Sequence, residues 1–339
     1  MLISESVNRC QSSVLFPVKN EGLEISVNSP YDFTLYYDLS LRGQQIPIPY
    51  IYSKTSWRCI IRTFSGRTIP IQVIPVENSN GSYLMVNILS DYSTEEASEI
   101  RKCITQVFCS DLDLSQFYQK VVEDPGLSEI VNRLTGLKPY LSQDPFEALI
   151  KAVVRQLVHA DTARRSIMML VLRFGIKQTV GEENYFGFPL AEMLSKAPKN
   201  ELIECKLGYK WKLVKTLSSD IVSGDLDLHE LSKISDEEII ERLEEYKGIG
   251  YWTSRIFLYD GLKRLNAYPI HDISLRKAIS MIYFQRKPVS WEEVESFFTG
   301  YEGYEGIATN YLFGALWLER CPNIQSPMKI GEIKCSLAS

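Results

Sequence analysis

The spacing of hydrophobic residues changes near residue 93, and the change separates two kinds of predicted structure. Before this point, short runs rich in β-branched and aromatic residues are divided by turn residues such as Ser65-Gly66. This pattern predicts an antiparallel meander. Pro70 and Pro75 are expected at an edge or a bulge, because proline cannot donate to the ladder. The predicted strands cover residues 57–62, 69–76 and 83–89.

From Ser93 onward the apolar residues recur at helical spacing. Ser93 precedes two glutamates, which is typical of a helix start with acid at the positive end of the dipole. Helical segments continue to about residue 320 and are interrupted at glycine and proline positions. The sequence therefore predicts an α+β protein, with a small antiparallel β-rich N-terminal domain followed by a mainly α-helical domain. The expected boundaries are 1–110 and 111–325, with a C-terminal tail at 326–339.

The composition is that of an ordinary globular protein. The 339 residues are 45% hydrophobic and 23% charged, which excludes a disordered or collagen-like chain. The seven cysteines show no metal-binding spacing, so idle thiols in a reducing compartment are expected. No apolar run reaches the ~18 residues that span a bilayer, and the N-terminus lacks a secretory signal. We expect an intracellular protein without a membrane partner, located in the cytoplasm if the source is a prokaryote.

The most informative segment is Gly248-Ile249-Gly250, which joins two predicted helices. Glycines on both sides of one apolar residue allow positive φ and leave the backbone N–H groups unshielded. These amides open the following helix, whose dipole favours an anion such as phosphate. For the glycines alone, the alternative is a plain helix–turn–helix connection.

Asp272 stands twenty-two residues after Gly250, at the start of the next helical run, where it could also be a simple N-cap. Together, the two glycines and Asp272 resemble the hairpin and downstream aspartate of the helix–hairpin–helix DNA glycosylases. Further motifs extend the resemblance over about residues 110–320, and Arg42-Gly43-Gln44 fits the small sheet domain of two branches of that superfamily. These motifs are the helix opening at 144–149, Gln156-Leu157-Val158 expected in the same helix, Leu207-Gly208-Tyr209-Lys210, and the C-terminal helix at 303–313.

Position 252 bears on the reaction that the resemblance implies. Bifunctional members have a lysine where this chain has Trp252, and an indole cannot act as that amine nucleophile. A monofunctional enzyme without AP lyase activity is therefore expected. The run from Gly248 to Thr253 is most similar to the AlkA-like 3-methyladenine DNA glycosylase II branch. The C-terminal helix looks more like the 8-oxoguanine branch, although Thr309 stands where that branch has a base-reading glutamine.

The resemblance implies roles in base excision repair of damaged double-stranded DNA by a monomer. Asp272 would stabilise the positive charge that develops at the sugar C1′ and activate the attacking water. Leu157 would fill the gap left by the flipped nucleotide, the alternative being a core leucine of an amphipathic helix. Trp252 is expected to line the base pocket, with Tyr209, Thr309 and Phe313 as further contacts. The expected DNA contacts are Leu157, Gln156, Lys247, Gly248, Gly250, Thr253, Lys210 and Arg276.

Several alternatives stay open at this point. The same residues fit a glycosylase for hypoxanthine or an oxidised purine, and they fit a non-catalytic module that only grips DNA. His271 beside Asp272 resembles the start of an HD-type metal site, but His159 and His229 stand in unrelated contexts. No side-chain metal site and no cofactor are expected, because the clustered cysteines of the iron–sulfur branch are also absent. The resemblance implies that hairpin carbonyl groups can hold a monovalent cation.

The net charge of −5 argues against a nucleic-acid partner, since such partners usually meet an excess of lysine and arginine. Counted locally, however, residues 150–180 carry +5 and residues 246–277 carry +4. These basic segments contain the motifs that are expected to meet phosphates. The net charge is therefore compatible with DNA binding, which we expect to weaken as the salt concentration rises. In a prokaryote the protein would be associated with the nucleoid.

Overall fold

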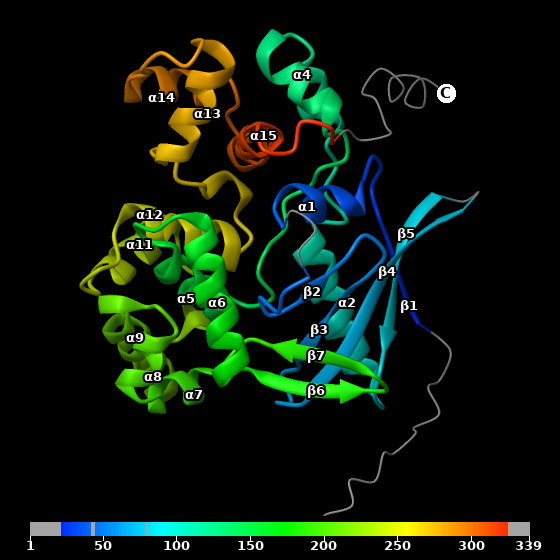
Figure 1. Ribbon diagram of the computed structural model, residues 1–339, viewed down its shortest axis with the longest axis vertical. Helices are drawn as coiled ribbons and strands as arrows, with labels where there is room; N and C mark the ends of the chain where they lie inside the picture. Colours follow the sequence, from blue (N-terminus) through cyan, green and yellow to red (C-terminus); the bar gives the residue numbers. More distant parts are fainter. Residues whose placement is uncertain (1–21, 42–44, 79–80, 325–339) are drawn as a thin grey trace, which may run out of the picture.

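The structure is a computed structural model that describes residues 22–41, 45–78 and 81–324. An antiparallel sheet lies beside a larger helical body, so the predicted α+β class is confirmed (Figure 1). Arg42-Gly43-Gln44 and the predicted tail at 326–339 fall outside the described residues. Within the described ranges, no helix is long and apolar enough to cross a membrane.

The five-stranded sheet has the order β1-β5-β4-β3-β2, and all neighbouring strands are antiparallel. Residues 68–73 of β4 pair with β3, and residues 71–78 pair with β5. Pro70 therefore lies outside the β5 ladder and Pro75 outside the β3 ladder, so each proline occupies a local edge of an internal strand. The strands are β1 (Leu23–Ser26), β2 (Ile51–Tyr52), β3 (Trp57–Arg62), β4 (Thr68–Asn78) and β5 (Gly81–Ile88).

The helical elements begin with α1, which precedes β2 in the chain, and continue after β5. Ser93 caps α2 in a capping box with Glu96, as the sequence predicts. A β-hairpin, β6 (Ile176–Val180) and β7 (Glu183–Gly187), interrupts them. The helices are α1 (Phe33–Leu39), α2 (Thr94–Phe108), α3 (Ser115–Val121), α4 (Pro125–Arg133), α5 (Pro145–Arg155), α6 (Ala160–Phe174), α7 (Ala191–Lys196), α8 (Lys199–Glu204), α9 (Trp211–Ser223), α10 (Leu228–Leu231), α11 (Asp236–Glu244), α12 (Tyr251–Ile256), α13 (Ile273–Tyr283), α14 (Trp291–Thr299) and α15 (Glu305–Leu318). Shorter turns are η1 (Gly208–Lys210), the π-helical η2 (Phe257–Gly261) and η3 (Leu265–Ala267).

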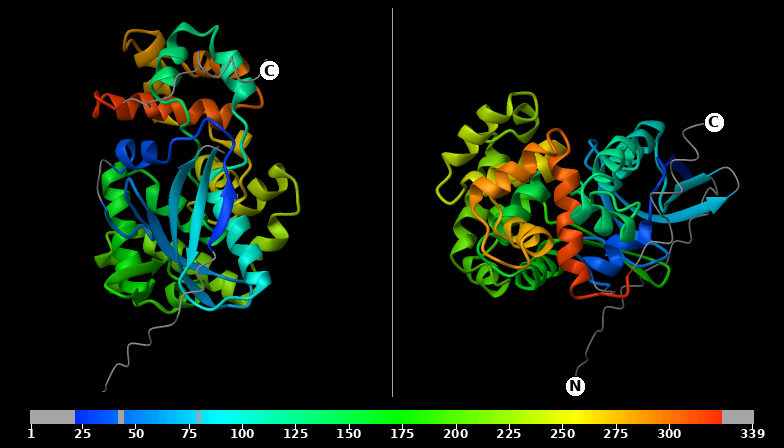
Figure 2. Two further views of the ribbon diagram at one scale, coloured as in Figure 1. Left: turned by 90° about the vertical axis from the view of Figure 1, so that its right-hand side faces the viewer. Right: turned by 90° about the horizontal axis from the view of Figure 1, so that it is seen from above.

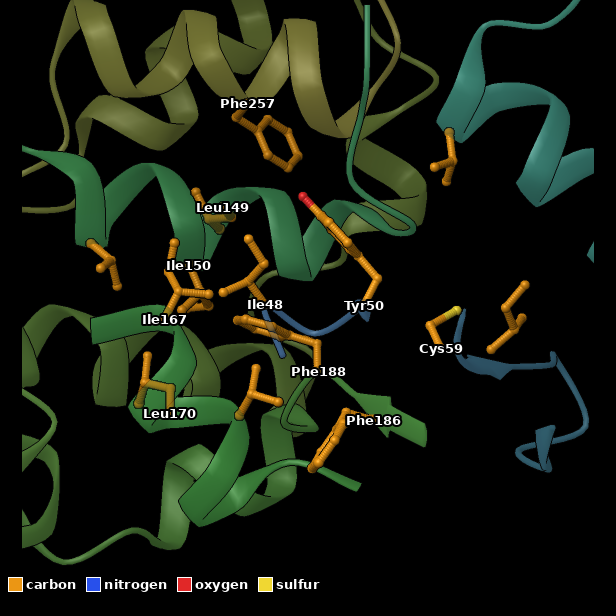
Figure 3. Packing of buried hydrophobic residues seen from close by; sticks show 14 of the residues in the cluster. Ile48, Tyr50, Cys59, Leu149, Ile150, Ile167, Leu170, Phe186, Phe188 and Phe257 are labelled. Carbon is orange, nitrogen blue, oxygen red and sulfur yellow. The ribbon is translucent and has the colours of Figure 1, made fainter. Parts of the chain in front are cut away.

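Two hydrophobic cores hold these elements together. The first joins the sheet to α5, α6 and the helices that follow them, and Figure 3 shows Ile48 and Tyr50 beside Leu149 and Ile150 of α5. The second packs α3, α4, α13, α14 and α15 together, and α1 joins it. Seen from above, α15 (red) runs between the sheet with the neighbouring blue-to-teal helices on one side and the green-to-orange helices on the other (Figure 2). Both cores thus cross residue 110, and the boundaries at 110/111 and 325/326 stay predictions.

Candidate active site

The glycine hairpin joins α11 to α12. Gly248 has a φ of +106°, a conformation that favours glycine, and Gly250 forms the N-cap of α12. Ile249 between them is buried in the first core. Lys247 and both glycines are exposed, so the turn presents its backbone and a lysine outward. This geometry suits contact with a phosphate backbone.

Gln156 fastens this hairpin to the end of α5. Its side-chain amide donates to the Gly248 carbonyl at 2.7 Å and to the Thr253 hydroxyl at 2.8 Å. Thr253 is buried, so in this structure Gln156 and Thr253 contact the hairpin and each other. The Gly248 carbonyl oxygen has a second lone pair, so this bond does not preclude a monovalent cation there. That cation stays a prediction.

Leu157 lies outside any helix, which corrects the prediction that Gln156-Leu157-Val158 continues α5. The helix ends at Arg155 because Gln156 leaves the helical region, with φ −55° and ψ +130°. Leu157 follows with a φ of +51°, and its side chain is 92% exposed. An apolar side chain this exposed is not a core leucine. Leu157 directly follows Gln156, whose side chain bonds to the hairpin, and its predicted DNA contact stays a prediction.

Lys210 and Tyr209 occupy places that the sequence did not predict. Lys210 is 5% exposed, and its ammonium donates to the Val154 carbonyl at 2.8 Å and to the Gln156 carbonyl. Burial lowers the pKa of Lys210. Both acceptors belong to the protein, so in this structure the Lys210 ammonium faces backbone carbonyls, and its predicted DNA contact stays a prediction. Tyr209 is 69% exposed and is not among the residues that line the cavity described next, so its contact with a base stays a prediction.

A cavity of about 380 Å³ lies between the helical body and the segments around α1. Its volume falls within the roughly 300–1,000 Å³ typical of small-molecule sites. Four predicted residues line it, among them Trp252 and Asp272. Thr309 and Phe313 of α15 line it as well, as do Tyr36 of α1 and Tyr50 before β2. The cavity thus draws its walls from segments far apart in the chain.

Asp272 is both an N-cap and a cavity residue. One carboxylate oxygen accepts the Ser274 backbone N–H at 2.6 Å and caps α13. The other accepts the Trp252 indole N–H, also at 2.6 Å. The carboxylate is 8% exposed and lies at the positive end of the α13 dipole, which favours negative charge. Capping therefore positions the carboxylate without removing it from the cavity.

Aromatic rings and one unpaired hydroxyl form the wall next to Asp272. Phe313 meets Tyr268 edge to face at 5.7 Å and stacks on Trp317 at 6.3 Å. Burial raises the pKa of Tyr268, and the nearby Asp272 charge raises it further, so Tyr268 stays a neutral phenol. Thr309 is 1% exposed, and its hydroxyl has no hydrogen-bond partner in the described part of the chain. A buried hydroxyl of this kind is available to a bound ligand.

The cavity lining also includes two cations and an acid that the sequence analysis did not name as site residues. Lys151 and Arg155 stand four residues apart on α5 and both line the cavity. Lys151 forms a buried ion pair with Glu147, whereas the Arg155 side chain is 41% exposed and lies 3.7 Å from Asp260. Burial raises the pKa of the Asp260 carboxyl, but Arg155 and its neighbouring cations outweigh burial and lower it. The available signal was two cations four residues apart in a mostly apolar helix whose one other charged residue is Glu147.

Arg276 and His271 flank Asp272 without forming a metal site. The Arg276 guanidinium lies 4.4 Å from the centre of the Trp291 ring, a cation–π contact that fixes it on the surface of α13. His271 contacts Glu295 at 2.8 Å. Across residues 22–41, 45–78 and 81–324, no group of three or more histidine, cysteine or acidic side chains could hold a metal ion.

Comparison with known proteins places these features in context. Residues 33–149 match the family model described as 8-oxoguanine DNA glycosylase, N-terminal domain. The chain is 26% identical over 249 residues to a DNA-3-methyladenine glycosylase of Bacillus subtilis, covering 72% of this chain and 82% of that protein. Its fold matches a 3-methyladenine DNA-glycosylase from Archaeoglobus fulgidus with a TM-score of 0.76 and 24% identity, over 88% of this chain and 98% of that one. It also matches the 8-oxoguanine glycosylase/lyase of Clostridium acetobutylicum in complex with double-stranded DNA, with a TM-score of 0.61 and 20% identity, over 83% and 100% of the two chains.

Proposed function

We propose that this chain, which belongs to the helix–hairpin–helix DNA glycosylase superfamily, hydrolyses the N-glycosyl bond of alkylated bases of the 3-methyladenine type in duplex DNA. The observation that carries the proposal is the contact between Trp252 and Asp272 inside one cavity beside the hairpin. The protein acts as a monomer, since hairpin, wedge and carboxylate all come from one chain.

The reaction needs a carboxylate beside the sugar. As the bond from C1′ to the base nitrogen breaks, its electron pair leaves with the base and positive charge develops at C1′. Asp272 stabilises this charge and accepts a proton from the water whose oxygen bonds to C1′. Both Asp272 oxygens keep lone pairs beyond the bonds to Ser274 and Trp252. The products are an abasic site and the free base: the electron pair neutralises a base that was cationic, and the proton on Asp272 passes to solvent.

The aromatic wall suits a cationic or electron-poor base. Alkylation at a ring nitrogen gives the base positive charge, and such a base is attracted to the electron-rich faces of Trp252 and Phe313. Thr309 supplies a hydroxyl that can donate to or accept from the edge of the base. Flipping costs a few kcal/mol, which the exposed Leu157 offsets by filling the vacated space.

The side chains in the cavity support release of the base without strand cleavage. Trp252 stands where a Schiff-base lysine would be needed and offers no amine. Lys151 is the one lysine among the lining residues, and its ammonium is bound to Glu147 and the Ser142 hydroxyl. An amine held in this way has no lone pair for attack on a sugar. We therefore propose a monofunctional enzyme.

A second candidate substrate is favoured by Arg155. A guanidinium can donate two parallel hydrogen bonds to O6 and N7 of a purine, and Arg155 presents exposed donors at the cavity. Hypoxanthine carries both acceptors, 8-oxoguanine keeps O6 but has a proton on N7, and 3-methyladenine lacks O6, so the bidentate contact favours hypoxanthine. This observation makes a 6-oxopurine glycosylase the alternative.

The test is a panel of duplexes that each carry one lesion, incubated with the wild-type protein. Release of 3-methyladenine above that of hypoxanthine and 8-oxoguanine supports the proposed substrate. Preferred release of a 6-oxopurine replaces it with the alternative. Tight DNA binding with no release from any duplex shows a non-catalytic DNA-binding module.

A further inference from the structure

The turn that carries Leu157 is held from two sides. From within the protein, the buried Lys210 ammonium binds the carbonyls of Val154 and Gln156. From the hairpin, the Gln156 side chain reaches Gly248 and Thr253. Gln156 is thus fixed through its main chain and through its side chain. The next residue along the chain is Leu157.

Leu157 has a conformation that needs such support. A positive φ brings its Cβ close to the backbone and is disfavoured for a residue that is not glycine. Its apolar side chain is 92% exposed, so no packing within the free protein compensates for this strain. Both costs favour relaxation of the turn. The bonds at Gln156 and Val154 oppose that relaxation.

The position of Lys210 matches the electrostatics of the helix end. The last carbonyl groups of a helix lack intrahelical partners and carry the negative end of the dipole. Lys210 supplies a charged donor to two such groups at the end of α5, and charge-assisted bonds are the strong kind. Lys210 comes from η1, fifty-odd residues further along the chain, so the contact ties the turn to a separate element.

We propose that Lys210 is a positioning residue which, together with Gln156, braces Leu157 for insertion into the DNA stack. This inference rests on the proposed function and deepens it. Through Gln156 the brace also links the wedge to the hairpin, so a hairpin bound to phosphates holds Leu157 at a fixed distance from the backbone. The brace does not touch the reacting atoms.

A purely structural role for Lys210 makes a different prediction. Loss of a stabilising contact lowers the activity on every substrate alike. Loss of the brace lowers activity only where a base must be flipped from a paired stack, because a single strand needs no wedge. The comparison of paired and single-stranded lesions therefore separates the two roles.

The experiment compares Lys210→Met with the wild type and with Leu157→Ala, using one lesion in paired duplex and in single-stranded DNA. Lys212→Met is the matched control, because Lys212 is an exposed lysine two residues away. We expect Lys210→Met and Leu157→Ala each to slow single-turnover release from duplex by about tenfold or more, with release from single strands nearly unchanged. The double variant should release the base no more slowly than the slower single variant, because both substitutions remove the same function, insertion of Leu157.

Equal loss on both substrates, or losses that multiply in the double variant, would overturn the brace. Gln156→Ala provides a second variant that leaves the buried ammonium in place, and the same duplex-specific loss is expected from it. If the wild type releases no base at all, the proposed function fails. The brace is then tested with 2-aminopurine placed beside the lesion, whose fluorescence rises when protein binding unstacks the neighbouring base. A smaller fluorescence rise with Lys210→Met than with wild type supports the brace, and an equal rise contradicts it.

Discussion

Trp252 donates its indole N–H to Asp272 at 2.6 Å, joining the first turn of α12 to the N-cap of α13. The bond fixes the indole plane against the cavity and satisfies a donor that would otherwise be buried without a partner. The opposite carboxylate oxygen is bound to the Ser274 backbone. The carboxylate is consequently held by two elements, and its orientation does not depend on a ligand.

Replacement of Asp272 by asparagine should separate catalysis from folding. Asparagine is also a good N-cap, so its oxygen keeps the bond to Ser274 and α13 keeps its start, while the negative charge near C1′ and the acceptor for the Trp252 N–H are lost. Release of 3-methyladenine in single turnover is expected to fall by about a hundredfold or more. DNA affinity, measured by fluorescence anisotropy, should stay within a few-fold of wild type. Release at the wild-type rate would show that Asp272 is only a cap.

Borohydride should trap no covalent adduct between the wild-type protein and lesion-bearing DNA. The reason is that Trp252 offers no amine, and the amine of Lys151 is bound to Glu147. The measurement is denaturing electrophoresis after incubation with borohydride. A trapped band that disappears in Lys151→Met, but persists in the exposed-site variant Lys212→Met, would establish lyase chemistry at Lys151.

Thr309→Val should change stability and activity in opposite directions. The hydroxyl has no partner in the described chain, so its replacement by a methyl group is expected to raise the free energy of unfolding by about 1 kcal/mol. If the hydroxyl bonds to the flipped base, release of the preferred lesion falls by roughly fivefold to tenfold. Thermal unfolding and single-turnover release measure the two effects. A more stable variant with unchanged release would remove Thr309 from base recognition.

Arg155→Gln should alter selectivity between bases. Loss of a bidentate contact to O6 and N7 is expected to lower hypoxanthine release by about tenfold, with a much smaller effect on 3-methyladenine. The control is Arg173→Gln, because Arg173 is paired with Glu201 and Glu204 away from the cavity. The ratio of the two release rates is the readout. An unchanged ratio would place Arg155 outside the base contacts.

Lys138→Met should stabilise the protein near neutral pH. Burial lowers the pKa of Lys138 to about 8, so at pH 7 the folded protein carries a buried ammonium that the unfolded chain holds in water. Between about pH 8 and 10.4 the unfolded chain binds the extra proton, and wild-type stability therefore rises with pH. The variant loses the bond to the Ser110 carbonyl and should still gain roughly 2 kcal/mol or less at pH 7. Urea unfolding at pH 7 and pH 10 should show this gain shrinking; an equal gain at both would contradict the prediction.

Local sequence patterns predicted the parts of the site that depend on nearby residues. The hairpin glycines, the cap at Asp272 and the strands of the meander appear in the structure where they were expected. Each rests on backbone chemistry within a few residues: a positive φ, an N-cap or a period of two. The end of α5 was predicted less well, because Gln156 leaves the helix to bond with Gly248, ninety-two residues away in the chain.

The sequence by itself thus determined the α+β class, the glycine hairpin and the start of α13, because these follow from contacts between neighbours in the chain. Only the tertiary structure decided which side chains reach the cavity. It buried Lys210 beside the turn of Leu157, left Tyr209 outside the cavity, exposed Leu157, and brought Lys151 and Arg155 into the cavity lining with Trp252. The physical reason is that exposure and cavity walls arise from packing between distant segments, which no local period encodes.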